Sequence, residues 1–192
     1  MSRLDLVVGP NGAGKSTFVR LTLAARRPGV PFVNADLLAA QRWPDPLEAM
    51  RRAAEAAEMA HAVREQLLAN RREFIAETVA SHPSKVDLVA QAARAGYYIA
   101  VHVVVVPEDL AVHRVARRIQ AGGHPVPEAK IRARHQRLWP HAAAMVPLAD
   151  VVEFYDNSGD RPRTVASFIG GEVVGLARWP HWTPDVLARL TE

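Results

Sequence analysis

The sequence predicts an α/β fold in which helices flank a mainly parallel β-sheet. Apolar runs of strand length alternate along the chain with longer segments of helical periodicity, the pattern of repeated βα units. Residues 98–106 are almost continuously β-branched or apolar, as expected for a central strand buried on both faces. A glycine-rich segment lies between the first apolar run and the first helical one. In sheets of this class, ligands bind at the carboxyl ends of the strands.

The expected elements follow the chain in order. We expect strands at residues 4–8, 31–36, 73–78, 98–106 and 151–156. We expect helices at residues 15–25, 47–70, 85–95 and 108–120, a further helix that ends near residue 139, and a short one at 184–190. Gly96 is a typical residue after a helix end. Residues 164–177 predict a β-hairpin that turns at Gly170 and Gly171.

The composition is that of an ordinary globular protein. The chain has 192 residues, of which 49% are hydrophobic and 23% charged, and this length predicts one domain over residues 1–192. The absence of cysteine excludes disulfides and thiolate metal sites. We find no secretion signal and no run of about 18 apolar residues, so we expect a cytoplasmic protein without a membrane partner.

The formal net charge is +4, and most of the basic residues are arginines. A basic surface can serve nucleic acid, a nucleotide or a phosphorylated substrate. Arginine together with abundant alanine and proline is also typical of a GC-rich genome. We therefore do not favour nucleic acid as the partner.

One motif predicts nucleotide binding. It matches G-x-x-x-x-G-K-[ST] and comprises Gly9, Pro10, Asn11, Gly12, Ala13, Gly14, Lys15 and Ser16. Glycines let the backbone N–H groups of such a loop approach phosphates, and the following helix adds its positive N-terminal end. Lys15 would bridge the β- and γ-phosphates, Ser16 would bind Mg²⁺, and Thr17 would lie near the α-phosphate. Because the motif stands between an expected strand and an expected helix, it predicts ATP and Mg²⁺ binding rather than a chance turn.

The rest of the chain favours a small-molecule kinase. A transporter-type ATPase would need a Ser-Gly-Gly signature, and a GTPase would need Asn-Lys-x-Asp, whereas Asn157 is followed by Ser158. A kinase needs a carboxylate near the acceptor hydroxyl and a basic lid over the γ-phosphate.

Carboxylates follow two of the expected strands. Asp36 is the candidate catalytic base, because it stands at the carboxyl end of residues 31–36. The alternative is that Asp36 caps a helix beginning near Leu37. Glu77 and Thr78 close the third strand and are candidates for acceptor binding or for support of Mg²⁺, with a plain polar strand end as the alternative.

Residues 114–137 predict a lid. Arg114 and Arg118 are four residues apart and share a helix face. A Gly122-Gly123 hinge follows, and a second helix carries Arg132, Arg134 and Arg137. Guanidinium groups on such a clamp can neutralise charge on a transferring phosphoryl group. The alternative is an exposed basic helical hairpin.

Together these segments resemble the zeta toxin family of P-loop kinases over residues 4–158. The resemblance rests on the phosphate loop, on the strand ends at Asp36 and at Glu77 and Thr78, and on the arginine segment at 114–118. It rests further on Gly122-Gly123-His124-x-Val126-Pro127 and on residues 147–158.

The resemblance implies a helix-flanked parallel sheet and ATP/Mg²⁺-dependent phosphorylation. Founding members of the family phosphorylate UDP-N-acetylamino sugars and are inhibited by an antitoxin. By position, Lys15, Asp36, Arg118 and Arg134 would be catalytic, Arg114 would help to bind ATP, and Asp36, Glu77 and Thr78 would face the acceptor. Those members carry Glu-Gly-Thr after the third strand, and this chain lacks that glycine.

Two other functions remain alternatives. A polynucleotide or RNA 5′-hydroxyl kinase would use the arginine excess to bind phosphates. A non-catalytic ATP-sensing protein would use lid closure to form a partner surface. Residues 159–192 suggest only packing of the C-terminus.

Overall fold

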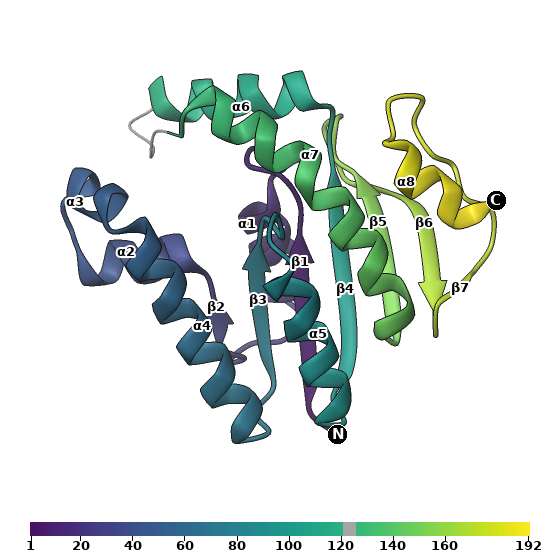
Figure 1. Ribbon diagram of the computed structural model, residues 1–192, viewed down its shortest axis with the longest axis horizontal. Coiled ribbons are helices and arrows are strands. Elements are labelled where there is room, and N and C mark those ends of the chain that lie inside the picture. The colour runs from purple at the N-terminus through teal and green to yellow at the C-terminus, as the bar shows by residue number, and fades with distance from the viewer. Residues whose placement is uncertain (121–125) are drawn as a thin grey trace.

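The computed structural model describes residues 1–120 and 126–192. Its centre is a seven-stranded sheet with the order β2-β3-β1-β4-β5-β6-β7, which confirms the expected α/β fold (Figure 1). β1 to β5 are parallel, and β6 and β7 are antiparallel additions at one edge. The strands are β1 (Arg3–Val8), β2 (Phe32–Val33), β3 (Phe74–Thr78), β4 (Tyr98–Val105), β5 (Val151–Asp156), β6 (Arg163–Ile169) and β7 (Glu172–Val173).

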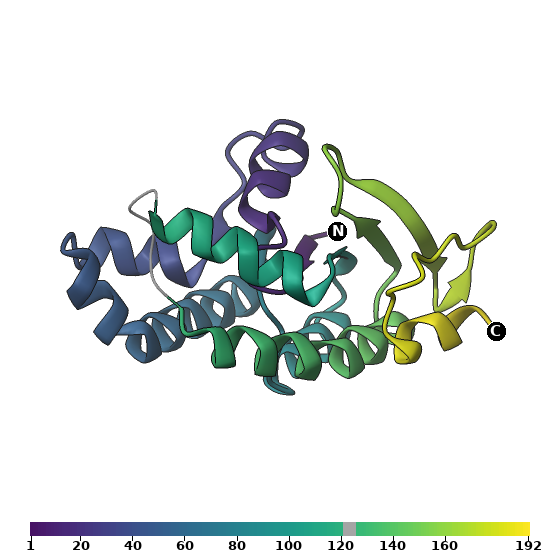
Figure 2. The same cartoon turned by 90° about the horizontal axis from the view of Figure 1, so that it is seen from above.

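Helices cover both faces of the sheet unequally. α4 (Ala53–Ala69), α5 (Ser84–Arg94), α7 (Glu128–Met145) and α8 (Asp185–Ala188) lie on one face, and α1 (Lys15–Phe18) lies on the other (Figure 2). α2 (Ala35–Arg42) and α3 (Pro46–Arg51) pack beside α4, and α6 (Glu108–Gln120) crosses over the carboxyl ends of the strands. No helix in the described ranges is both long enough and apolar enough to span a membrane.

The strand order brings the candidate residues to one edge. β1 lies between β3 and β4, and Val8 at its end is in register with Thr78 and with Val103. The phosphate loop, which leaves the end of β1, therefore starts beside the end of β3. β4 is buried almost throughout, as its run of β-branched residues predicts.

Two expected helices are irregular. The one expected at residues 15–25 is α1 followed by a π-helical segment at Val19–Leu23, in which the amide of Ala24 donates to the carbonyl of Val19. The one expected at residues 47–70 is divided into α3 and α4, because Arg52 leaves helical geometry at φ −93° and ψ 15°. An apolar-periodic pattern does not reveal such a local change of hydrogen bonding.

The prediction of a strand over residues 31–36 is wrong at its end. β2 stops at Val33, and Asp36 lies in the first turn of α2. The cause is Asn34, whose side chain accepts a hydrogen bond from the amide of Leu37 and so begins the helix one residue after the strand. Asp36 is therefore neither the last residue of a strand nor the cap of the helix.

At the other end of the chain, the elements agree with expectation more closely. β5 and the hairpin of β6 and β7 form where they were expected, with the turn at Gly170 and Gly171. α7 continues through Pro140 to Met145, several residues beyond the expected end. Its second half is held in the core by buried residues: Leu138, Trp139, Ala142 and Met145.

Candidate functional site

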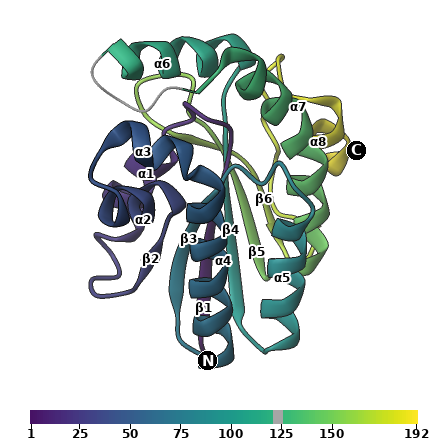
Figure 3. The ribbon, with the colours of Figure 1, turned by 60° about the vertical axis from the view of Figure 1, so that its left-hand side comes forward.

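A cavity of about 900 Å³ opens at the carboxyl ends of β1 and β3. Figure 3 shows α6 crossing over the strand ends, with α2, α3 and the start of α4 below it. The cavity brings together most of the residues expected from the sequence: Asn11, Gly12, Gly14, Lys15, Ser16, Thr17, Asp36, Glu77, Thr78, Arg114, Arg118 and Arg134. Gly9, Pro10 and Ala13 complete the same loop behind its lining.

The cavity is strongly basic. Its described lining includes two acidic residues, Asp36 and Glu77, and seven basic ones. The basic residues are Lys15, Arg64, Lys85, Arg114, Arg118, Lys130 and Arg134. Such an excess in a concave site attracts anions and suits a polyphosphate.

The glycines of the phosphate loop are required by space as well as by backbone conformation. Gly12 and Gly14 have φ of +78° and +86°, which residues with a side chain rarely adopt. A Cβ on Gly12 would lie 2.5 Å from the carbonyl oxygen of Ala111 in α6. A Cβ on Gly14 would lie 2.6 Å from Nδ2 of Asn157. The loop is therefore packed directly against α6 and the segment that follows β5.

Gly14→Ala is expected to weaken nucleotide binding beyond its effect on stability. The positive φ alone costs about 1 kcal/mol of unfolding free energy or more. The new Cβ would also displace Asn157, whose Nδ2 donates to the carbonyl of Ala13 at 2.7 Å. Gly29→Ala is the matched control, because Gly29 has φ +81° and an open Cβ position. Equal ATP affinity of the two variants, by calorimetry, would show that the Asn157 contact is unimportant.

Lys15 is held inside the loop. Its side chain is buried, and Nζ donates to the carbonyl of Pro10 at 2.9 Å and lies 3.9 Å from Oε1 of Glu77. Burial lowers the pKa of Lys15, and the carboxylates of Glu77 and Asp36 oppose that shift. The positive charges of Arg118 and Arg134 lower the pKa further. Asp36, Arg118 and Arg134 line the same cavity as Lys15.

Ser16, Glu77 and Asn34 form one hydrogen-bonded group. The Ser16 hydroxyl donates to the carboxylate of Glu77 at 2.9 Å, and Nδ2 of Asn34 donates to the same carboxylate at 2.8 Å. Mg²⁺ prefers oxygen ligands and is usually bound through one or two carboxylates together with substrate phosphates. A hydroxyl and a carboxylate side by side at the loop therefore fit a magnesium ion. In the described residues no cluster of three or more acidic or histidine side chains offers another metal site.

Asn34 and Asn157 are functional candidates that the sequence did not reveal. Asn34 links the start of α2, where Asp36 lies, to Glu77 at the end of β3. Asn157 holds the phosphate loop through Ala13, and its own carbonyl accepts from the guanidinium of Arg114 at 2.8 Å. Neither role has a local signature, because each joins segments far apart in the chain.

The basic residues of the expected lid, residues 114–137, divide into those that line the cavity and those that do not. Arg114 and Arg118 on α6, and Lys130 and Arg134 on α7, face the cavity with the four-residue spacing of one helix side. Arg132 instead forms ion pairs with three carboxylates, those of Glu108, Asp109 and Glu128. Arg117 and Arg137 are exposed and lie outside the cavity lining. The expected hinge at Gly122 and Gly123, with His124 and Pro125, falls outside the described residues.

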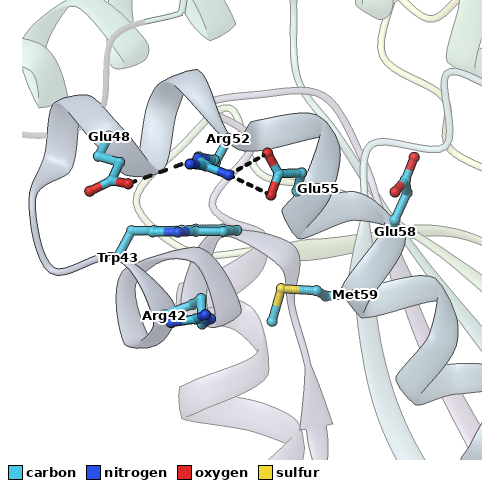
Figure 4. A pocket seen from close by; sticks show the side chains of 7 residues that line it. All are labelled: Arg42, Trp43, Glu48, Arg52, Glu55, Glu58 and Met59. Atoms are coloured by element: carbon cyan, nitrogen blue, oxygen red, sulfur yellow. Dashed lines mark hydrogen bonds and ion pairs between the residues drawn. The ribbon is translucent and has the colours of Figure 1, made fainter.

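A second hollow of about 680 Å³ lies between α2, α3 and α4. Figure 4 shows Arg52 between Glu48 and Glu55, above the ring of Trp43. Arg42, Glu58 and Met59 complete the lining. The charged groups at its centre bind one another, and the phosphate loop lies elsewhere. We therefore place the candidate active site in the larger cavity.

Comparison with known families and proteins agrees with this geometry. The sequence model of the AAA domain family matches residues 4–141. This span runs from β1 through the phosphate loop and α6 to His141 in α7. A comparison with curated protein sequences found no match.

Solved structures share the fold at low sequence identity. A structure from the PezAT chromosomal toxin-antitoxin system of Streptococcus pneumoniae has a TM-score of 0.68 at 12% identity, covering 99% of this chain and 84% of that one. The AvrRxo1-ORF1:-ORF2 complex with ATP gives 0.66 at 15% identity, covering 91% and 60%. Shikimate kinase from Acinetobacter baumannii gives 0.51 at 20% identity, covering 78% and 81%. The chain thus has a P-loop kinase-like fold and spans 60% of the AvrRxo1 chain it matches.

Proposed function

We propose that this chain, which belongs to the AAA domain family, is an ATP- and Mg²⁺-dependent phosphotransferase acting on a hydroxyl of a small molecule. The observation that carries the proposal is the single basic cavity in which the phosphate loop, Asp36 and the basic side chains of α6 and α7 meet. The end of the cavity that is lined by α4 and by the start of α5 leaves room for an acceptor.

The phosphate loop would hold the nucleotide. Its backbone N–H groups and the start of α1 would bind the β-phosphate, and Lys15 would contact the β- and γ-phosphate oxygens. Ser16 and Glu77 would hold Mg²⁺, which neutralises charge on the phosphates when bound. Thr17 follows in the first turn of α1 and would lie near the α-phosphate.

The transfer step needs a base and positive charge around the moving group. The acceptor oxygen would form a bond to the γ-phosphorus while the bond from that phosphorus to the bridging oxygen of ADP breaks. Asp36 would accept the hydroxyl proton, and Arg118 and Arg134 would neutralise charge on the phosphoryl oxygens. Arg114 would support the loop through Asn157 as well as the nucleotide. Glu77 and Thr78 would face the acceptor.

The favoured acceptor is a UDP-N-acetylamino sugar, with an antitoxin protein as a possible partner. This finer assignment rests on the zeta toxin resemblance of residues 4–158. It is supported by the shared fold of the PezAT structure, whose system is a toxin-antitoxin pair. The basic cavity is compatible with the diphosphate of such a sugar.

Incubation with γ-labelled ATP and Mg²⁺ tests the proposal. The acceptor pool contains nucleotide-sugars, nucleosides, sugars, hydroxy acids and a single-stranded oligonucleotide with a 5′-hydroxyl. Label on a small molecule supports the proposal. Label only on the oligonucleotide would favour a polynucleotide kinase, and ATP binding without any labelled product would favour an ATP-sensing protein.

Glu77→Gln is expected to raise the Mg²⁺ concentration needed for half-maximal activity. The amide keeps the shape of the side chain but removes the charge that would attract the ion beside Ser16. We expect a shift of at least about tenfold, because loss of a residue that only supports a metal ligand already costs roughly 10- to 100-fold in metal affinity or activity. A magnesium titration at saturating ATP measures it, with Glu65→Gln on the exposed side of α4 as control. An unchanged titration curve would remove Glu77 from the metal site.

A further inference from the structure

One wall of the cavity carries two basic side chains that the roles above do not use. Arg64 lies on α4 and Lys85 lies in the first turn of α5, and both line the cavity. The residue Arg64 is only 4% exposed. Its Nε is buried without a hydrogen-bond partner among the described residues. Within residues 1–120 and 126–192, no carboxylate forms an ion pair with either side chain.

A buried cation without a counter-charge is costly. Desolvation of such a group costs several kcal/mol unless an opposite charge compensates it. Burial lowers the pKa of Arg64, and the charge of Glu65, its neighbour in the chain, opposes that shift only in part. Burial together with the nearby charge of Arg64 lowers the pKa of Lys85. The buried carboxylate of Asp5, by contrast, is paired with Arg3 and Arg27. Arg64 lines the cavity without an ion pair, which points to an anion that is supplied from outside the chain.

This basic pair is distinct from the cations around the phosphate loop. Arg64 and Lys85 come from α4 and α5, whereas the other basic residues of the lining come from α1, α6 and α7. The two groups therefore occupy different parts of one cavity. A triphosphate held by the loop would contact the cations near the loop. Arg64 and Lys85 would then face the acceptor.

The wall that leads to Arg64 is made of small side chains. Ala53, Ala57, Ala60 and Arg64 are four, three and four residues apart and form one face of α4 toward the cavity. Alanine leaves the space beside the helix open. Ser81 and Ser84 add hydroxyl groups near Lys85, and the start of α5 adds its positive helix end. Room, hydroxyl donors and two cations thus occur together on the α4–α5 side.

We propose that Arg64 and Lys85 bind an anionic group of the acceptor, a carboxylate or a phosphate, while the acceptor's hydroxyl faces Asp36. The proposal rests on the phosphotransferase function above and narrows its substrate to an acid. The guanidinium group offers two parallel donors to a carboxylate or phosphate, and the Lys85 ammonium adds a point charge. Binding would supply the counter-charge that the buried guanidinium lacks. Neutral sugars and nucleosides would leave that charge unpaired and would be rejected.

The acceptor pool tests this inference when it is composed of matched pairs. Each hydroxyl compound is offered as a carboxylic acid or phosphate ester and as its neutral amide or dephosphorylated form. We expect label on the acids. Arg64→Gln and Lys85→Gln should raise KM for the acid roughly 10- to 100-fold, the worth of one charge-assisted hydrogen bond, with kcat and KM for ATP unchanged. The matched control is Arg94→Gln, which removes an exposed charge from the end of α5. Label on neutral members only, or an unaltered KM in both variants, would overturn the inference.

A binding measurement separates this inference from the proposed function. The phosphate loop is first filled with Mg²⁺ and a non-hydrolysable ATP analogue, and inorganic phosphate or acetate is then added during thermal unfolding. We expect phosphate, acetate or both to raise the unfolding temperature of the wild type and of Arg94→Gln, but not of Arg64→Gln. The anion that raises the unfolding temperature more indicates whether the acceptor is a phosphate ester or a carboxylic acid.

The outcomes can be told apart. A rise in unfolding temperature with phosphate or acetate, without label on any acceptor, would contradict phosphoryl transfer but support the anion site. Transfer to neutral acceptors without this response would contradict only the anion site. A structural role is also distinguishable, because Arg64→Gln without ligand is expected to unfold at the wild-type temperature or higher, once an unpaired buried cation is removed. A lower unfolding temperature with an unchanged KM would overturn the inference.

Discussion

Lys15→Ala is expected to reduce phosphoryl transfer by at least about 10²–10³-fold, the effect of removing one charge-stabilising group from a preorganised site. The Lys15 ammonium group is already buried beside Glu77, and Lys15 lines the same basic cavity as Asp36, Arg118 and Arg134. An alanine leaves the β- and γ-phosphates without that charge. Initial rates with γ-labelled ATP measure the loss.

The same variant also tests the structural role of Lys15. Because burial already penalises the charge of Lys15, its removal is expected to leave the unfolding temperature close to that of the wild type. Lys15→Arg keeps the charge but changes the shape of the donor, and it should not restore activity. Turnover by Lys15→Ala at more than a tenth of the wild-type rate would contradict the proposed role of the loop.

Asp36→Asn is expected to lower kcat by roughly 10²–10⁴-fold, the range for loss of a general base. The side chain keeps its size but can no longer accept the acceptor's proton. ATP affinity should remain that of the wild type, because Asp36 belongs to α2 whereas the proposed nucleotide site is the loop after β1. Rapid mixing with labelled ATP measures the chemical step, and calorimetry measures nucleotide binding.

The control for Asp36→Asn is Asp87→Asn. Both aspartates lie in the first turn of a helix, where a carboxylate favours the helix dipole, but Asp87 is exposed and outside the cavity lining. A comparable loss of activity in the two variants would assign the effect of Asp36 to helix stability. Full activity of Asp36→Asn would remove Asp36 from the mechanism.

Features that depend on local pattern were predictable from the sequence. The phosphate loop follows β1, β4 is the buried central strand, and α6 has its expected bounds, because each element carries its own periodicity or motif. The meeting of Lys15 and Glu77 in one cavity also follows, because the ends of neighbouring parallel strands lie at one edge of the sheet.

Features that depend on contacts between distant segments were not predictable. The Asn34 side chain reaches Glu77 at the end of β3, which lies 43 residues further along the chain. Arg64 and Lys85 belong to helices whose patterns predict only packing, and their shared position in the cavity arises from how α4 and α5 meet the sheet. Lys130 could have been found, because it stands four residues before Arg134.

The hydrogen bonds that hold the phosphate loop affect the energetics of ligand binding. Nζ of Lys15 is bound to the carbonyl of Pro10, the hydroxyl of Ser16 to Glu77, and Nδ2 of Asn157 to the carbonyl of Ala13. An incoming polyphosphate exchanges some of these internal bonds for its own rather than adding to them, so each new contact yields little net heat. The compensating advantage is rigidity, because a loop fixed in shape beforehand loses little conformational freedom upon association.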